Sequence, residues 1–172
     1  MSARAEFYIK GRRLLDKSYH LKAIGLPNVY LLNGVSIEHD ADYGTLITIE
    51  DIPGLHRAVG LHIVTKSDEL TGSEFRFLRK EMNLTQEALA QRLRVNVQTV
   101  ANYEKGRTSM GAADAAMRAL YTLHILPAEA DASLGRAFID AIMAARPDGR
   151  LPERSQKKIA GSWRDAAQRK AA

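Results

Sequence analysis

The chain has 172 residues, of which 45% are hydrophobic and 26% charged, so it resembles an ordinary globular protein with enough apolar side chains for a core. It contains no cysteine, which excludes disulfides, cysteine-bound zinc, iron–sulfur clusters and thiol catalysis. Its apolar runs are far shorter than the ~20 residues of a membrane span, and residues 1–16 lack the apolar stretch of a secretion signal. We therefore expect a cytoplasmic protein without a membrane partner.

The net charge of +5 is unevenly distributed along the chain. Residues 36–69 carry seven acidic and two basic side chains, whereas residues 70–107 carry four acidic and seven basic ones, and residues 146–172 carry three acidic and eight basic ones. A charged stretch is most often a solvated surface. The basic stretches also permit a nucleic-acid partner, and the acidic one would suit a basic protein.

Residues 18–49 have the pattern of short β-strands. Two turn signals divide them, Gly25-Leu26-Pro27-Asn28 and Asn33-Gly34. Strands are predicted from their Tyr, Leu and β-branched residues at Ser18–Ala23, Val29–Asn33 and Thr45–Ile49. These strands predict a small antiparallel sheet.

A helix is predicted after Pro53-Gly54, over Leu55–Val64. Its apolar side chains can pack against the sheet; they are Leu55, Val59, Leu61 and Ile63.

From Thr71 onward the signals are helical. Thr71 and Glu74 have the spacing of a capping box, and the helix that follows should end at Asn83. Capping residues then predict two short helices, Gln86–Leu93 after Thr85 and Val97–Lys105 after Asn96, the second ending at Gly106. Further helices are expected at about 110–126 and 132–145, before Pro127 and Pro147, and the tail from Arg150 either forms a last helix around Ile159 and Trp163 or stays partly disordered.

Residues 84–106 form the most informative segment. Two short helices joined by a tight turn can cross steeply only where the contact is small and apolar, and Ala90 supplies the small residue. The shared core is expected from Leu89, Leu93, Val95, Val100 and Tyr103. The second helix then has an outer face without large or acidic side chains, made of Val97, Gln98, Ala101 and Asn102. A plain amphipathic helical hairpin is the alternative interpretation.

The sequences LTQEALAQRL and TVANYEKGR in this segment resemble the helix-turn-helix of the XRE (Cro/repressor) family of DNA-binding regulators. The resemblance implies that the second helix reads DNA in the major groove. Arg94 departs from the family pattern, which has glycine in the turn, so it either adopts a left-handed conformation at a cost of about 1 kcal/mol or more, or the turn differs.

By position, the resemblance assigns base readout to the outer face of the second helix. Gln98 and Asn102 can each bond bidentately to adenine, Val97 can contact a thymine methyl group, and Ala101 lies on the same face. Phosphate contacts are expected from Gln86, Thr99, Lys105 and Arg107 and, where a solvated helix face is equally compatible, from Arg76, Arg79 and Lys80.

Upstream, the segments GLPNVYL, GLHRAVGLHIV and LTGSEFRFLRKEMNLTQ resemble antitoxin-like regulators of the YgiT/MqsA type. That resemblance implies a small β-rich domain before the helix-turn-helix, dimerisation and repression of the protein's own operon. The family's paired Cys-x-x-Cys zinc ligands are missing, and the five histidines have no ligand spacing. We therefore expect no metal and no cofactor.

Together these observations predict an α+β fold: a small N-terminal antiparallel sheet with a helix, followed by an all-α helix-turn-helix domain. The predicted divisions are 1–69, 70–127 and a C-terminal helix with a basic tail at 128–172. The expected function is a homodimeric repressor that binds double-stranded DNA at an inverted repeat; the alternative is an antitoxin that binds a toxin protein. Because no phosphate-binding loop, nucleophile motif or metal-ligand set is found, we do not expect an enzyme.

Overall fold

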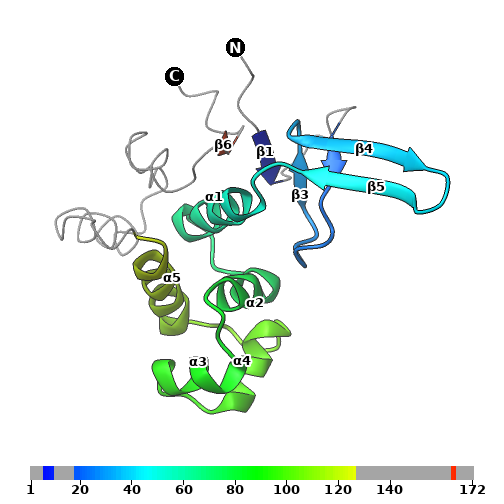
Figure 1. Cartoon of the computed structure of the whole chain (residues 1–172). Helices are drawn as coiled ribbons and strands as arrows, with labels where there is room; N and C mark the ends of the chain where they lie inside the picture. Colours follow the sequence, from blue (N-terminus) through cyan, green and yellow to red (C-terminus); the bar gives the residue numbers. More distant parts are fainter. Residues whose placement is uncertain (1–5, 10–17, 127–163, 166–172) are drawn as a thin grey trace, which may run out of the picture.

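The computed structural model describes residues 6–9, 18–126 and 164–165 and has an α+β architecture (Figure 1). The N-terminal strands are β1 (Glu6–Ile9), β2 (Tyr19–His20), β3 (Val29–Leu31), β4 (Val35–Asp40) and β5 (Gly44–Ile49). The helices are α1 (Ile52–Thr65), α2 (Gly72–Glu81), α3 (Gln86–Leu93), α4 (Val97–Glu104) and α5 (Ala112–Ile125), and a last short strand is β6 (Arg164–Asp165). The predicted fold class is therefore confirmed.

The strands form two sheets instead of the single one that was predicted. One has the order β2-β3-β1-β6, in which β3 pairs antiparallel with β1 and β2, and β6 lies parallel to β1. The other is a hairpin of β4 and β5 alone. The predicted strand at Thr45–Ile49 exists, but it pairs with β4, which was not predicted because Glu38, His39 and Asp40 interrupt its β-branched pattern.

Of two predictions about the C-terminal part of the chain, the structure covers one in part and the other not at all. Residues 164–165 form a strand, so the predicted last helix does not extend over them. The rest of that prediction and the helix at 132–145 lie outside the described residues.

Helix α1 lies between the four-stranded sheet and the remaining helices (Figure 1). It starts earlier than predicted because Asp51 caps it, accepting a hydrogen bond of 3.0 Å from the Gly54 N–H group, and Pro53 lies in its first turn. All four predicted core residues of this helix are buried, and α1 packs against α2, α5 and β6. One hydrophobic core runs from Phe7 to Tyr121, so the predicted boundary at 69/70 does not coincide with a gap in the core.

The contact between α1 and α5 is very close at Gly60. A methyl group there would lie 2.0 Å from the Tyr121 hydroxyl oxygen, so only glycine leaves room for the tyrosine ring. Burial raises the pKa of Tyr121 far above its ordinary value, and the hydroxyl stays protonated.

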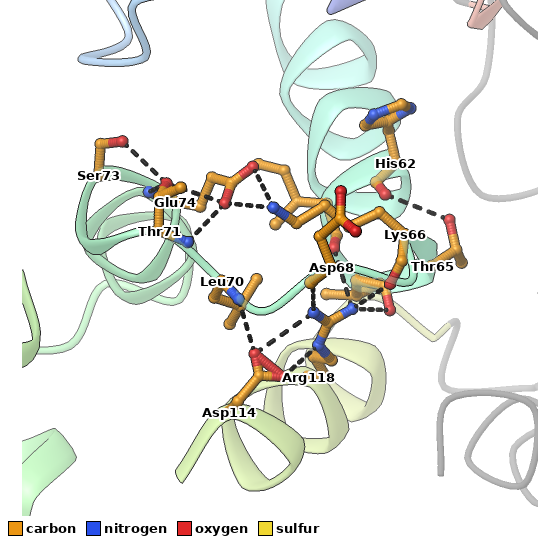
Figure 2. A network of polar contacts seen from close by, with 12 residues as sticks. His62, Thr65, Lys66, Asp68, Leu70, Thr71, Ser73, Glu74, Asp114 and Arg118 are labelled. Atoms are coloured by element: carbon orange, nitrogen blue, oxygen red, sulfur yellow. Dashed lines mark hydrogen bonds and ion pairs between the residues drawn. The ribbon is translucent and has the colours of Figure 1, made fainter. Parts of the chain in front are cut away.

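The loop between α1 and α2 is fixed to α5 by the buried guanidinium of Arg118 (Figure 2). Its Nη1 donates to the carbonyl oxygens of Ile63, Val64 and Lys66, at 3.3, 3.0 and 2.7 Å. Nη2 donates to the Asp68 carbonyl at 2.6 Å, and Nε donates to Asp114 Oδ1 at 2.6 Å. The guanidinium thus binds carbonyl groups at the end of α1, which have no partner within the helix.

Carboxylates complete the connection on either side of this loop. Asp114 Oδ2 accepts from the Leu70 N–H group at 2.9 Å, and Glu69 Oε1 accepts from the Met110 N–H group at 3.0 Å, near the start of α5. Glu74 closes the predicted capping box with Thr71 and also accepts from Lys66 Nζ at 2.7 Å (Figure 2). The backbone on which α2 begins is therefore held from both sides.

We expect Arg118→Met to lower the free energy of unfolding by about 3–5 kcal/mol, because it leaves the half-buried Asp114 carboxylate and several carbonyl groups without their donor. Urea denaturation measures this loss, and the slope of the unfolding free energy against urea concentration should stay unchanged. The matched control is Arg92→Met on the exposed surface of α3, which should change stability by less than about 0.5 kcal/mol. Equal effects of the two substitutions would contradict the role of Arg118.

Candidate nucleic-acid interface

Helix α3 begins and ends where its side chains predict. Thr85 Oγ1 accepts from the Ala88 N–H group at 3.0 Å, which satisfies one of the free donors of the first turn. The helix stops at Arg94, which has φ 55° and ψ 41°. Of the two alternatives for Arg94, the structure has the left-handed conformation, which turns the chain toward α4.

Helix α4 is capped in the same way. Asn96 Oδ1 accepts from the Gln98 N–H group at 2.8 Å. At the other end Gly106 has a φ of 64°, and the Arg107 N–H group donates to the Asn102 carbonyl at 3.0 Å. Both predicted ends of this helix are therefore confirmed, with the last helical residue at Glu104.

The two helices pack through a small apolar contact. Leu89, Ala90 and Val100 are buried, as predicted, and Leu93 and Val95 pack at its edge. Tyr103 extends the contact to α2, where its ring meets the edge of Phe75 with the centroids 5.6 Å apart. Buried Ala90 is the small side chain that was expected at the crossing.

Helix α2 also touches the end of α4 directly. A Cβ atom at Gly72 would lie 2.6 Å from the Glu104 carbonyl oxygen and 2.7 Å from that of Tyr103. Backbone atoms cannot yield as a flexible side chain can. Glycine at this position therefore sets how closely the start of α2 approaches the end of α4.

The outer face of α4 presents two amides together (Figure 1 shows this helix at the end of the molecule opposite β1). Gln98 Nε2 donates to Asn102 Oδ1 at 3.2 Å. This bond uses one N–H group of Gln98 and the oxygen of Asn102, so Gln98 Oε1 and Asn102 Nδ2 keep their capacity to bond a base edge. Val97 beside them has 46% of its surface exposed, and Ala101 is half-buried.

Arg79 does not belong to this outer surface, because its guanidinium is bound within the protein. A phosphate contact from Arg79 stays a prediction. Its Nε donates to Glu104 Oε1 at 2.5 Å, its Nη2 to Glu104 Oε2 at 3.2 Å and its Nη1 to the Leu84 carbonyl at 2.7 Å. Only 11% of the side chain is exposed. The guanidinium instead neutralises a buried carboxylate and ties α2 to α4.

Gln86 joins the same group. Its Nε2 donates to Glu104 Oε2 at 2.8 Å, and the side chain is half-buried at the start of α3. Three helices are thus connected through one carboxylate. A phosphate contact from Gln86 stays a prediction.

The other predicted phosphate ligands differ from Arg79 and Gln86 in having no such role in the protein interior. Arg76, Lys80, Lys105 and Arg107 are exposed, and Thr99 is half-buried. The structure adds two exposed cations that the sequence analysis did not assign, Arg92 on α3 and Arg94 in the turn. Their basic residue type and their place next to α4 in the sequence are the signals that could have identified them. Of the acidic side chains of α2 to α4, only Glu87 is exposed, so positive charge predominates among the exposed side chains of these helices and their ends.

Within residues 6–9, 18–126 and 164–165, no three acidic or histidine side chains gather at a site that could hold a metal ion. His56 Nδ1 lies 2.9 Å from Glu81 Oε1, and His20 Nε2 bonds the Pro27 carbonyl.

In the same described part of the chain, every helix is too short or too polar to cross a membrane.

Residues 75–116 match the model of a helix-turn-helix family. The match covers most of α2, all of α3 and α4, and the start of α5, and it agrees with the capping and packing described above. Comparison with the curated proteins and with the solved structures gives no match. The chain therefore carries a DNA-binding helix-turn-helix of the XRE type in this segment.

Arg79 and Arg76 lie three residues apart on α2 and should behave in opposite ways. Arg79→Met should lower the free energy of unfolding by about 3–5 kcal/mol, since it leaves the buried Glu104 carboxylate unpaired. Arg76→Met should leave stability within about 0.5 kcal/mol, because the side chain is exposed. Urea denaturation of both variants gives the comparison, and a stable Arg79→Met protein would contradict the ion pair's role.

Proposed function

We propose that the chain is a sequence-specific transcriptional regulator that binds an inverted-repeat operator as a homodimer and represses transcription. The observation that carries this proposal is the exposed amide pair of Gln98 and Asn102 on a capped helix, among exposed side chains that are predominantly positive. Such a helix fits the major groove, where glutamine and asparagine recognise adenine by bidentate hydrogen bonds. The exposed cations around it suit phosphates on both sides of the groove.

We infer a homodimer because one DNA-contacting helix covers only a short stretch of DNA. A single helix contacts only a few base pairs, and two copies related by a two-fold axis read half-sites about 34 Å apart. An inverted repeat in the operator would mirror that symmetry. Autoregulation of the protein's own gene is the simplest arrangement and places the first operator to test directly upstream.

Gln98→Ala and Asn102→Ala should each reduce the preference for operator over scrambled DNA, because each good bidentate contact discriminates by about 1–3 kcal/mol. Fluorescence anisotropy with the footprinted upstream site and a scrambled duplex measures both affinities. Thermal unfolding should stay nearly unchanged, since both side chains face solvent at least in part. Selectivity that survives both substitutions would show that other residues read the bases.

Arg107→Ala should instead weaken binding to every DNA sequence by a similar factor. One lost phosphate contact should lower the slope of log affinity against log salt concentration by about 0.9. Titrations at several salt concentrations test this, with Arg57→Ala as the control, because Arg57 is an exposed cation on α1, away from α3 and α4 (Figure 1). A loss confined to the operator would assign Arg107 to base readout.

A second candidate function, an antitoxin that binds a basic toxin, is favoured by the acidic N-terminal surface. No lysine or arginine occurs between Lys22 and Arg57, while Glu38 and Asp40 are exposed. Two N–H groups, those of Tyr43 and Asp42, hold the pKa of Asp40 below its ordinary value, so this carboxylate stays ionised near neutral pH. A small toxin-like reading frame beside the gene, with co-purification of its product, is the observation that would support this role.

A further inference from the structure

The β4–β5 hairpin projects from the rest of the molecule, away from the recognition helix (Figure 1). Four of the large hydrophobic side chains that the described residues expose lie on it: Ile37, Tyr43, Leu46 and Ile47. An isolated two-stranded hairpin is marginally stable in water. The base of this one is anchored, because Val35 and Ile49 pack against the core, but its outer two-thirds has no cover within the described residues.

The register gives the hairpin one apolar and one polar face. Val35 lies opposite Ile49, Ile37 opposite Ile47, and His39 opposite Thr45. Directly opposed residues share a face, so these six side chains lie on one face, which is apolar at Val35, Ile37, Ile47 and Ile49, ends in the hydrogen-bonded pair of His39 and Thr45, and carries no carboxylate. Glu38 and Asp40 are on the other face.

The two edges of the hairpin differ in charge. β4 carries Glu38, His39 and Asp40, whereas β5 reads Gly-Thr-Leu-Ile-Thr-Ile and has no charged residue. Exposed edge strands are normally protected from pairing by lysine, proline or a bulge. β5 contains no lysine or proline, and no strand of the described residues pairs with its outer edge.

The alternation of hydrogen bonds along the hairpin shows which backbone groups of β5 do not bond to β4. The Glu50 N–H group donates to the Gly34 carbonyl at 2.9 Å, which makes this opposed pair a hydrogen-bonded one. Opposed pairs alternate along an antiparallel ladder. The backbone N–H and C=O groups of Thr45, Ile47 and Ile49 therefore point to the outer edge, away from β4.

We propose that β5 pairs antiparallel with β5 of a second copy of this chain, about a two-fold axis that passes beside Ile47. The pairing produces a four-stranded sheet in the order β4-β5-β5-β4. Ile47 lies opposite Ile47 of the second copy, and Thr45 lies opposite its Ile49. In this register every outward N–H group of these residues faces an outward C=O group, and the two apolar faces join into one. The inference supplies the interface for the homodimer of the proposed function.

The charge distribution favours a second copy of this chain as the partner and the outer edge of β5 as the edge that pairs. With β5 in the centre, the two β4 strands are three strand spacings apart, about 14 Å. That separation exceeds the screening length of about 8 Å at physiological salt, so repulsion between the two sets of carboxylates is weak. Pairing through β4 would place Glu38 and Asp40 of both copies on neighbouring strands. A basic protein would be drawn to the carboxylates of β4 and the polar face, not to the uncharged edge.

The absence of cysteine from the chain makes the register directly testable. In Ile47→Cys, the two sulfurs are attached to residues whose Cα atoms are about 5.5 Å apart across the axis, within the range of a disulfide. Ile37→Cys is the matched control. Ile37 lies on the same face and is similarly exposed, with 51% of its surface accessible against 45% for Ile47. Because it lies on β4, it is too far from Ile37 of the second copy for a disulfide to form. Oxidation of the full chain without DNA should give a covalent dimer for Ile47→Cys and leave Ile37→Cys monomeric on a non-reducing gel.

A second variant tests the pairing without cross-linking. Ile47→Lys should weaken self-association at least tenfold by sedimentation velocity, whereas Leu46→Lys, on the polar face, should change it less. Circular dichroism should show both variants folded, since both positions are exposed. The proposal is overturned by cross-links at both cysteine positions, at Ile37 alone or at neither, or by an Ile47→Lys dimer as strong as that of the natural chain. These readouts need no DNA, so their failure is distinguishable from a failure of the base-reading variants.

Discussion

The buried guanidinium of Arg118 is the interaction on which the arrangement of the helices depends. The last carbonyl groups of α1 have no partner within their own helix, and arginine has enough donors in one plane to bind several of them while still pairing with Asp114. This fixes the segment from which α2 starts. Since α2 in turn contacts the end of α4 at Gly72 and binds Glu104 through Arg79, the position of the recognition helix follows from a chain of contacts that begins in α5.

The helical part of the fold could be predicted because its signals are local. Thr71, Thr85 and Asn96 each cap a helix within three residues of themselves, and Gly106 and Arg94 take the left-handed conformations that end two of them. The sheets could not be predicted in the same way. One of the two partners of β1 is β6, which is far away in the sequence, and the pairing of β5 with β4 depends on a strand whose charged residues mask its pattern. Pairing between distant segments leaves little trace in either segment alone.

The same distinction between local and distant signals applies to the residues of the candidate site. Gln98 and Asn102 could be assigned to one face because helical periodicity places them one turn apart, and the structure brings their amides together. Whether they read bases stays a proposal. Arg79 has the same residue type and helix as Arg76, so composition could not separate the two. Only the folded chain shows that Glu104, 25 residues later, binds the guanidinium of Arg79 and leaves that of Arg76 in solvent.

The close approach of Gly72 to the carbonyl groups at the end of α4 has a consequence for the thermodynamics of association. With no space for even a methyl group between the two helices, and with a bidentate ion pair beside the contact, α4 cannot tilt without carrying α2 with it. DNA would therefore meet a surface that is already in its bound shape. Little conformational entropy would be lost in ordering this surface, and the heat-capacity change on binding would come from the burial of apolar surface and the release of its water, with no contribution from the folding of a helix.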